Sequence, residues 1–254
     1  MLEELTITMV FHAILLFARI GTMLMLLPGF GESNTSMQGR LWFAAGLSLV
    51  FLPLLQPTLP PVPTSTISLV LLVSSEIIVG VFIGSMTRIV FSVLHTAGMI
   101  ISFQMGLSAA MLFDPSQGSQ GSVVGNFLTL VAFVLLFTTN MHHVFIYGMI
   151  DSYVVFVPAD PLPWGEFAEF AGRLTSDVFS MAFRMASPLV ICGLLVYLAA
   201  GVMSRLMPQM QVFFVLVPLQ VLLGFFILIV TMSGSMMWFM DYLAEVYASM
   251  LIPN

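Results

Sequence analysis

The sequence predicts an all-α protein that is associated with a membrane and built from about seven to nine helical segments paired as hairpins. Two observations on the 254-residue chain carry this prediction. Charged residues make up 7% of the chain, against about 25% in a soluble domain. Apolar residues make up 59% and form runs as long as a membrane span, which needs roughly 20 residues. This number of charged side chains is too small for the surface of a soluble protein. We therefore expect lipid or apolar partner proteins to cover much of this chain.

The apolar windows mark the expected helices in order along the chain. Four windows contain no charged residue: Ile89–Phe113, Val123–Ile150, Met185–Ser204 and Val212–Met240. Three further windows are interrupted by polar residues or prolines: Leu5–Phe30 by His12 and Arg19, Leu41–Leu59 by Pro53 and Pro57, and Ile67–Thr87 by Glu76. Each window is long enough to be considered as a helix that crosses a membrane.

Short segments rich in proline, glycine or polar residues separate these windows. They are residues 57–65, 114–122, 138–143, 158–165 and 207–211. Adjacent prolines stop a helix, and Gly/Ser-rich stretches favour loops. We therefore predict one domain over 1–254, with N-terminal helices in 1–113 and C-terminal helical hairpins in 123–254.

Residues 165–177 differ from the rest because they alternate apolar and charged positions at helical spacing. The apolar face comprises Phe167, Phe170, Leu174 and Val178, and the charged face comprises Glu166, Glu169, Arg173 and Asp177. This pattern predicts an amphipathic surface helix whose charged side faces water or another protein. Pro163 lies just before it, at a common helix start.

The composition and motifs argue against several function classes. All six cationic residues are arginines and the net charge is −6, which disfavours nucleic-acid binding because phosphate contacts need clustered cations. The chain has no zinc-binding His-Glu-x-x-His, no phosphate loop with lysine and no Gly-x-Ser-x-Gly elbow. We therefore predict no enzyme activity, no cofactor and no metal site. The single cysteine, Cys192, lies in an apolar run and is expected to be a buried thiol.

Charges inside the apolar windows need partners, because an unpaired charge in a bilayer costs several kcal/mol. Glu76 and Arg88 lie 12 residues apart, which is about 18 Å along one helix, so they cannot contact each other. Arg19 and Arg184 need partners for the same reason. We predict that these four side chains pair within a helix bundle or lie in a wet or protein-covered zone. A proton or ion path is the alternative, but such a path normally uses paired acids near mid-span.

Small residues at helix-packing spacing predict close contacts between helices. They occur in Gly80-x-x-x-Gly84, Ala199-Ala-Gly201 and Ser233-Gly-Ser235. The 21 methionines are explained by apolar packing, although a soft seal around a varied polypeptide would favour the same residue.

Several strings occur in an order that resembles one protein family. They are Arg19-x-Gly21, Pro28-Gly-Phe-Gly31, Glu76-x-x-x-Gly80-x-x-x-Gly84, Gly98-x-x-x-Ser-x-Gln104-x-Gly106, Asp114-Pro115, Ser204-Arg-Leu-Met-Pro-Gln209, Phe213, Pro218 and Gly224. Together they resemble the FliR family, the R subunit of the bacterial flagellar type III export gate, and its SctT relatives in injectisomes. The chain departs from the common family pattern at Gln211 and Gln220.

The resemblance implies an all-helical inner-membrane subunit of the flagellar basal body, similar to a fusion of the gate's P and Q subunits. The implied partners are the P and Q subunits (FliP and FliQ), the A and B subunits (FlhA and FlhB), and the unfolded flagellar proteins that are exported. The core of such an assembly is expected to lie above the membrane plane. The alternatives are an injectisome subunit and a small-solute secondary transporter.

The resemblance also implies roles for individual residues. Residues 103–122, called the plug-like segment below, correspond by position to the piece that blocks the closed channel. Its expected gate residues are Met105, Gly106, Leu107, Met111, Leu112, Phe113, Asp114 and Gly118. Residues expected in structural or subunit contacts are Arg19, Glu76, Arg88, Gln104, Arg205, Pro208 and Gln209. Of these, Glu76 and Arg88 are expected to make buried polar contacts at subunit interfaces.

Overall fold

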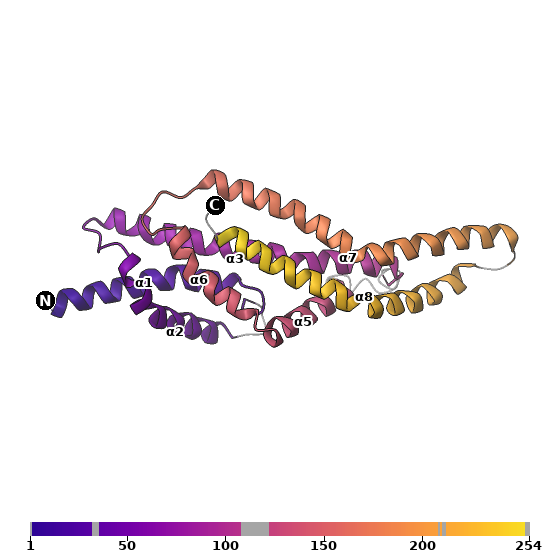
Figure 1. The fold of residues 1–254 in the computed structure, drawn as a ribbon, viewed down its shortest axis with the longest axis horizontal. Helices are drawn as coiled ribbons and strands as arrows, with labels where there is room; N and C mark the ends of the chain where they lie inside the picture. Colours follow the sequence, from indigo (N-terminus) through magenta and orange to yellow (C-terminus); the bar gives the residue numbers. More distant parts are fainter. Residues whose placement is uncertain (1, 32–35, 108–121, 208, 210–211, 252–254) are drawn as a thin grey trace. The chain divides into compact units, whose positions relative to one another are not determined.

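The computed structural model describes residues 2–31, 36–107, 122–207, 209 and 212–251. Within these residues the chain forms seven α-helices and one short 3-10 helix, and no strand (Figure 1). The elements are α1 (Leu2–Leu26), α2 (Met37–Leu55), η1 (Gln56–Thr58), α3 (Thr66–Gln104), α5 (Val123–Thr138), α6 (His142–Val155), α7 (Trp164–Leu206) and α8 (Val212–Leu251). The prediction of an all-α protein with seven to nine helical segments is confirmed.

The chain divides into two compact units. Unit 1 comprises Met1–Val90, Thr139–Leu174 and Ala244–Asn254, and unit 2 comprises Phe91–Thr138 and Thr175–Leu243. Three helices, α3, α7 and α8, contribute residues to both units.

Some predicted boundaries between helices are wrong because the helices are longer than the apolar windows. The windows Ile67–Thr87 and Ile89–Phe113 join into the single 39-residue helix α3, since Arg88 between them is a good helix former. The amphipathic residues 165–177 and the window Met185–Ser204 likewise join into the 43-residue helix α7. Pro188 lies inside that helix without ending it.

Two breaks fall where the sequence predicts them. The helix is interrupted between the end of α5 at Thr138 and the start of α6 at His142, and Asn140 adopts a left-handed conformation with φ of 59°. Asparagine tolerates this region better than most residues. The second break is the predicted one near residues 207–211, where α7 ends at Leu206 and α8 begins at Val212.

The end of α1 explains the Pro28-Gly29 string. The Phe30 amide donates to the Leu27 carbonyl over 3.2 Å, and Gly29 has φ of 87°. This arrangement is a type II turn, which favours proline second and needs a residue that accepts positive φ third. The turn ends α1 ahead of α2, whose first turn is capped by the Ser36 hydroxyl.

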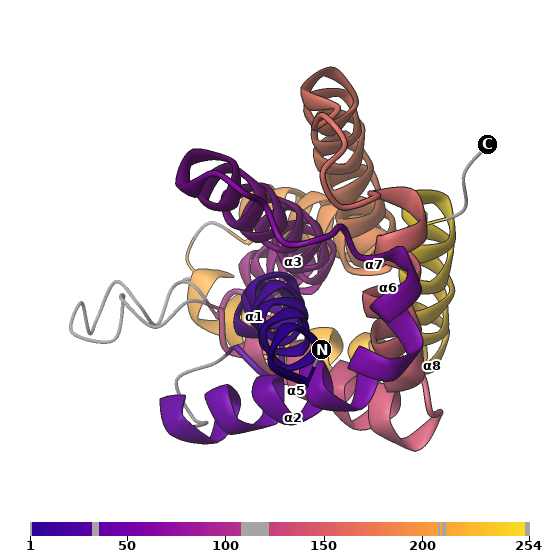
Figure 2. The ribbon, with the colours of Figure 1, turned by 90° about the vertical axis from the view of Figure 1, so that its left-hand side faces the viewer.

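Glycines bring α1 and α3 together in unit 1. A Cβ atom on Gly80 would meet Thr22 and would lie 2.5 Å from the Arg19 carbonyl oxygen. A Cβ atom on Gly84 would lie 2.6 Å from the Cβ atom of Leu26. The predicted helix contact at Gly80-x-x-x-Gly84 is therefore confirmed. Helix α2 lies alongside α1 in the same unit (Figure 2).

The start of α7 packs through its apolar face, as its pattern predicts. The Phe167 ring stacks on the Phe82 ring of α3 with centroids 3.9 Å apart. On the charged face, the exposed side chains of Glu169 and Arg173 lie 3.8 Å apart. A pair this exposed adds little stability, so the aromatic contact holds this part of α7 in unit 1.

Unit 2 also packs through glycines and aromatic rings. A Cβ atom on Gly98 of α3 would collide with the Gly125 backbone of α5. Phe91 of α3 contacts Phe133 of α5 and Phe239 of α8, with ring centroids 5.3 and 5.4 Å apart. Gly201 and Gly234 have open space instead, so these two glycines do not bring helices together within the described residues.

Among the described residues, five helices are long and apolar enough to cross a membrane, or up to six if α5 and α6 together count as one span. Many large apolar side chains on them are exposed, for example Trp42 (79%), Ile229 (72%) and Phe226 (67%). These features are those of a membrane-type fold.

Substituting Gly80 or Gly84 by alanine tests the contact between α1 and α3. We expect each change to destabilise the protein by about 1–3 kcal/mol, because the backbone and β-carbons opposite cannot swing away as a flexible side chain can. The measurement is the thermal unfolding midpoint in detergent. Gly46→Ala on α2, where a Cβ meets nothing within 4 Å, is the matched control and should be neutral or slightly stabilising. Equal midpoints for all three variants would contradict the packing.

Candidate functional site

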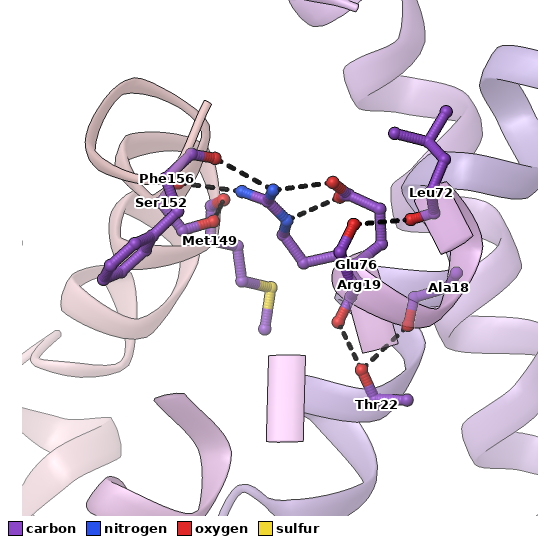
Figure 3. Close-up of polar contacts among 9 residues, drawn as sticks. Ala18, Arg19, Thr22, Leu72, Glu76, Met149, Ser152 and Phe156 are labelled. Atoms are coloured by element: carbon purple, nitrogen blue, oxygen red, sulfur yellow. Dashed lines mark hydrogen bonds and ion pairs between the residues drawn. The ribbon is translucent and has the colours of Figure 1, made fainter. Parts of the chain in front are cut away.

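Unit 1 contains a buried ion pair between α1 and α3 (Figure 3). Arg19 donates from Nε to Glu76 Oε2 over 2.7 Å and from Nη2 to Glu76 Oε1 over 2.9 Å. Both side chains are 1% exposed. The two parallel hydrogen bonds match the flat guanidinium to the carboxylate, which is the strongest geometry for such a pair.

The rest of the guanidinium caps the end of α6. Nη1 donates to the Ser152 carbonyl over 2.8 Å, and Nη2 donates to the Phe156 carbonyl over 2.9 Å. The last carbonyls of a helix have no partner within the helix, and a cation there also suits the helix dipole. The Tyr153 ring lies under the guanidinium at 4.1 Å. Arg19 therefore joins three helices at one point.

This geometry gives the partners of two of the charges in the apolar windows, Arg19 and Glu76. The expectation that Glu76 contacts a neighbouring subunit needs correction, because both carboxylate oxygens bind Arg19 of the same chain. The prediction of pairing inside a bundle describes this residue better than a proton path does. Arg88 is exposed and has no hydrogen bond or ion pair within the described residues, so its subunit contact stays a prediction.

Unit 2 contains the second cluster, at the carboxyl end of α3 where the plug-like segment begins. Gly106 has φ of 74°. The Leu107 amide donates to the Ser102 carbonyl over 3.0 Å, and the Gly106 amide donates to the Phe103 carbonyl over 3.1 Å. This pair of bonds is a Schellman motif, which ends a helix with glycine in the left-handed region. The Gln104-x-Gly106 string thus forms a helix stop.

The residues around this helix end come from α7 and α8. Gln220 of α8 is 5% exposed, and its Nε2 donates to the Gln104 carbonyl over 3.4 Å. Met105 is fully buried against Gly224, and the Gln104 side chain lies against Gly193. A cavity of about 20 Å³, which has room for roughly one water molecule, lies beside them. Its lining includes Gln104, Cys192, Gly193, Gln220 and Gly224.

The structure describes only part of the predicted gate and contact residues. Gln104, Met105, Gly106 and Leu107 are brought together at the end of α3. Arg205 lies exposed in the last turn of α7, and Gln209 is exposed in the connection to α8. The remaining predicted residues fall outside the described part of the chain: Met111, Leu112, Phe113, Asp114, Gly118 and Pro208.

Sequence reasoning missed three residues of these clusters. Tyr153 and Gly193 gave no signal, because an aromatic residue or a glycine in an apolar helix does not reveal what it faces. Gln220 was visible as a departure from the family pattern, and such a polar residue in an apolar window was the available clue. Cys192 is half-buried rather than fully buried. Within the described residues, no group of three or more His, Cys, Asp or Glu side chains could hold a metal ion.

The fold and both clusters define an all-helical membrane protein whose buried polar groups serve packing. Comparison with known proteins gives its family. Residues 10–246 match the family of bacterial export proteins, family 1. The chain is 36% identical over 230 residues to the flagellar biosynthetic protein FliR of Caulobacter vibrioides, covering 90% of this chain and 92% of the relative. It is 32% identical to FliR of Bacillus subtilis, covering 87% and 85%.

A more distant relative is a translocation protein. The Yop proteins translocation protein T of Yersinia pestis is 29% identical over 176 residues, covering 67% of this chain and 66% of the relative. The chain thus belongs to family 1 of the bacterial export proteins, and its resemblance to FliR is confirmed.

Removing one member of the buried ion pair should be worse than removing both. Glu76→Gln leaves the Arg19 charge buried without a counter-ion, and we expect a loss of about 3–5 kcal/mol. The double variant Arg19→Met, Glu76→Leu should recover part of this loss, although the α6 carbonyls then lose their donor. Thermal unfolding of the detergent-solubilised protein measures both, with the exposed Arg88→Met as control. Additive losses in the double variant would contradict the pairing.

The Tyr153 hydroxyl is buried and has no hydrogen-bond partner within the described residues. An unsatisfied buried hydroxyl is unfavourable, so we expect Tyr153→Phe to be neutral or to stabilise the protein by up to about 1 kcal/mol. Tyr153→Leu should destabilise it, because the ring under Arg19 is lost. The measurement is the thermal unfolding midpoint of each variant. A Tyr153→Phe variant as unstable as Tyr153→Leu would show that the Tyr153 hydroxyl makes a stabilising hydrogen bond.

Proposed function

We propose that this chain is a structural, pore-forming subunit of the flagellar type III protein export gate, required for flagellum assembly. The observation that carries the proposal is the 36% identity to a flagellar biosynthetic protein FliR over nearly the full length of both chains. The match to the Yersinia translocation protein is weaker in identity and coverage, which favours the flagellar system over an injectisome.

The partners we propose are the P, Q, A and B subunits, FliP, FliQ, FlhA and FlhB, in the bacterial inner membrane at the basal body. The exported proteins would cross as unfolded chains through the pore that these subunits enclose. The large exposed apolar surface of α2, α7 and α8 supports assembly with other subunits. The cavity beside Gln104 is too small for a solute, which argues against a transporter site there.

A deletion strain tests the proposed function. Removing the gene should abolish flagella and the export of flagellar proteins, and the wild-type chain should restore both. The chain should also purify with co-expressed P and Q subunits, and imaging should show them in one particle. Normal flagella in the deletion strain, or a chain that purifies alone from a cell producing all three, would overturn the proposal.

We further propose that residues 103–122 block the closed channel. Deleting Gly106–Gly118 should leave the complex assembled but make the membrane leaky to ions. The measurement is ion conductance of cells or vesicles that contain the assembled complex, with P and Q co-purification as the control for assembly. Wild-type conductance in an assembled deletion complex would remove the blocking role.

A further inference from the structure

The part of α7 that belongs to unit 2 has one apolar side that the rest of the described chain leaves uncovered. Its inner side packs within unit 2 through Leu189 and Gly193, which are buried. Its outer side carries large apolar side chains that are about 60% exposed: Ile191 (61%), Leu194 (60%) and Leu198 (60%). A contiguous apolar face of this size is covered by lipid or by another protein.

The exposed side chains follow the spacing of a coiled-coil contact. Residues 184, 187, 191, 194, 198, 201 and 205 alternate steps of three and four, as the a and d positions of successive heptads do. They are Arg184, Ser187, Ile191, Leu194, Leu198, Gly201 and Arg205, called the α7 seam below. Ser187 is half-buried and the others are exposed. Leu195 and Val202, in the neighbouring e positions, widen the apolar face. The pattern fits one partner helix packed along α7.

Gly201 leaves a notch in the α7 seam. A Cβ atom on Gly201 would meet nothing within 4 Å, whereas a Cβ atom on Gly193 or Gly224 of the same unit would collide with Gln104 or Met105. Glycine is unfavourable inside a helix, and a close contact with another helix is the usual compensation. Fluid lipid gains nothing from a missing side chain. The notch therefore favours protein over lipid as the cover of this face.

Arginines close both ends of the α7 seam and indicate the charge of its partner. Arg184 and Arg205 lie 21 residues apart, which is about 32 Å along the helix. Neither side chain has an ion pair or a hydrogen bond within the described residues. Two copies of this seam would bring arginines to the same level in either orientation, and like charges there disfavour a second copy. Carboxylates at the same spacing would pair with both guanidinium groups.

We infer that the α7 seam binds one apolar helix of a different protein, with a large side chain opposite Gly201 and an acidic residue level with each arginine. This inference rests on the proposed function, because a neighbouring subunit of the export gate supplies the helix. The seam is exposed in this chain, so changing it affects assembly and leaves the fold intact.

A cysteine scan in a Cys192→Ser background tests the seam. It compares the chain produced alone with the complex co-purified with the P and Q subunits, in the same detergent. The reaction rates of Leu194→Cys and Leu198→Cys with N-ethylmaleimide should fall at least about tenfold on assembly, because the core of an interface excludes reagent and water. Ala199→Cys and Met203→Cys are the matched controls. Both positions are exposed on the same stretch of α7 but lie off the seam, so their rates should not change.

Reversing the charges tests the chemistry of the partner. Arg184→Glu combined with Arg205→Glu should lower co-purification at least about tenfold, because carboxylates would then face carboxylates. Lysine at both positions should keep most of the co-purification. Arg173→Glu, exposed elsewhere on α7, is the control for a charge change of the same sign. The unfolding midpoint of the chain produced alone should be equal in all of these variants.

Three results would overturn the inference. Equal rates at Leu194→Cys in the lone chain and the complex would show that detergent or lipid covers the seam. A disulfide-linked dimer through Leu194→Cys would show that a second copy does. Full co-purification of the glutamate variant would show that the partner has no carboxylates there. Should that variant not fold, the cysteine scan decides alone. Failure of the proposed function is distinct, because the wild-type chain would then not co-purify with the P and Q subunits.

Discussion

Two opposite charges are buried inside unit 1, and the arrangement of three of its helices follows from how Arg19 and Glu76 neutralise each other. Apolar helices in lipid have little preference for one packing register over another. Lipid tails are as apolar as leucine side chains, so the hydrophobic effect does not favour one contact between helices over another. The bidentate pair has a single geometry. The two carbonyls at the end of α6 extend this constraint to a helix that lies more than 130 residues away in sequence. Charge therefore specifies which helices meet, and apolar contacts fill the space around them.

Close approach at glycines is the second way in which this chain sets the register of its helices. Gly80 and Gly84 let α1 approach α3, Gly98 and Gly125 let α3 approach α5, and Gly224 admits Met105. Each pair of atoms contributes little dispersion energy, so helices attract each other only where many atom pairs come into close contact. Polar groups lie beside these contacts in both units: Arg19 beside Gly80, and Gln220 beside Gly224. A small residue and a polar anchor together give one packing arrangement, whereas either feature alone is common in apolar helices.

Much of the fold is predictable because its signals are local. The break near Asn140 and the two faces of residues 165–177 depend on neighbours within one or two turns, and both predictions are confirmed. The pairing of Arg19 with Glu76 is not local, since 57 residues separate them, so the sequence indicates that each needs a partner but does not name it. The continuity of α3 through Arg88 was missed because hydropathy windows treat a charge as a boundary, whereas helix propensity does not. Gly193 and Gln220 could not be assigned because their role depends on the residues of α3 that face them.

The apolar part of α8 is as long as one membrane crossing. Leu216–Met250 is a candidate membrane span of 35 residues, but Asp241 and Glu245 lie in its last third, so its uncharged part is residues 216–240, which extend over about 38 Å at 1.5 Å per residue. The hydrocarbon core of a bilayer is about 30 Å thick, so this uncharged part fits a bilayer at a tilt within the usual range of up to about 40°. Only 17% of its most apolar window is buried inside the chain. Most of this apolar surface is therefore left for lipid or other protein to cover.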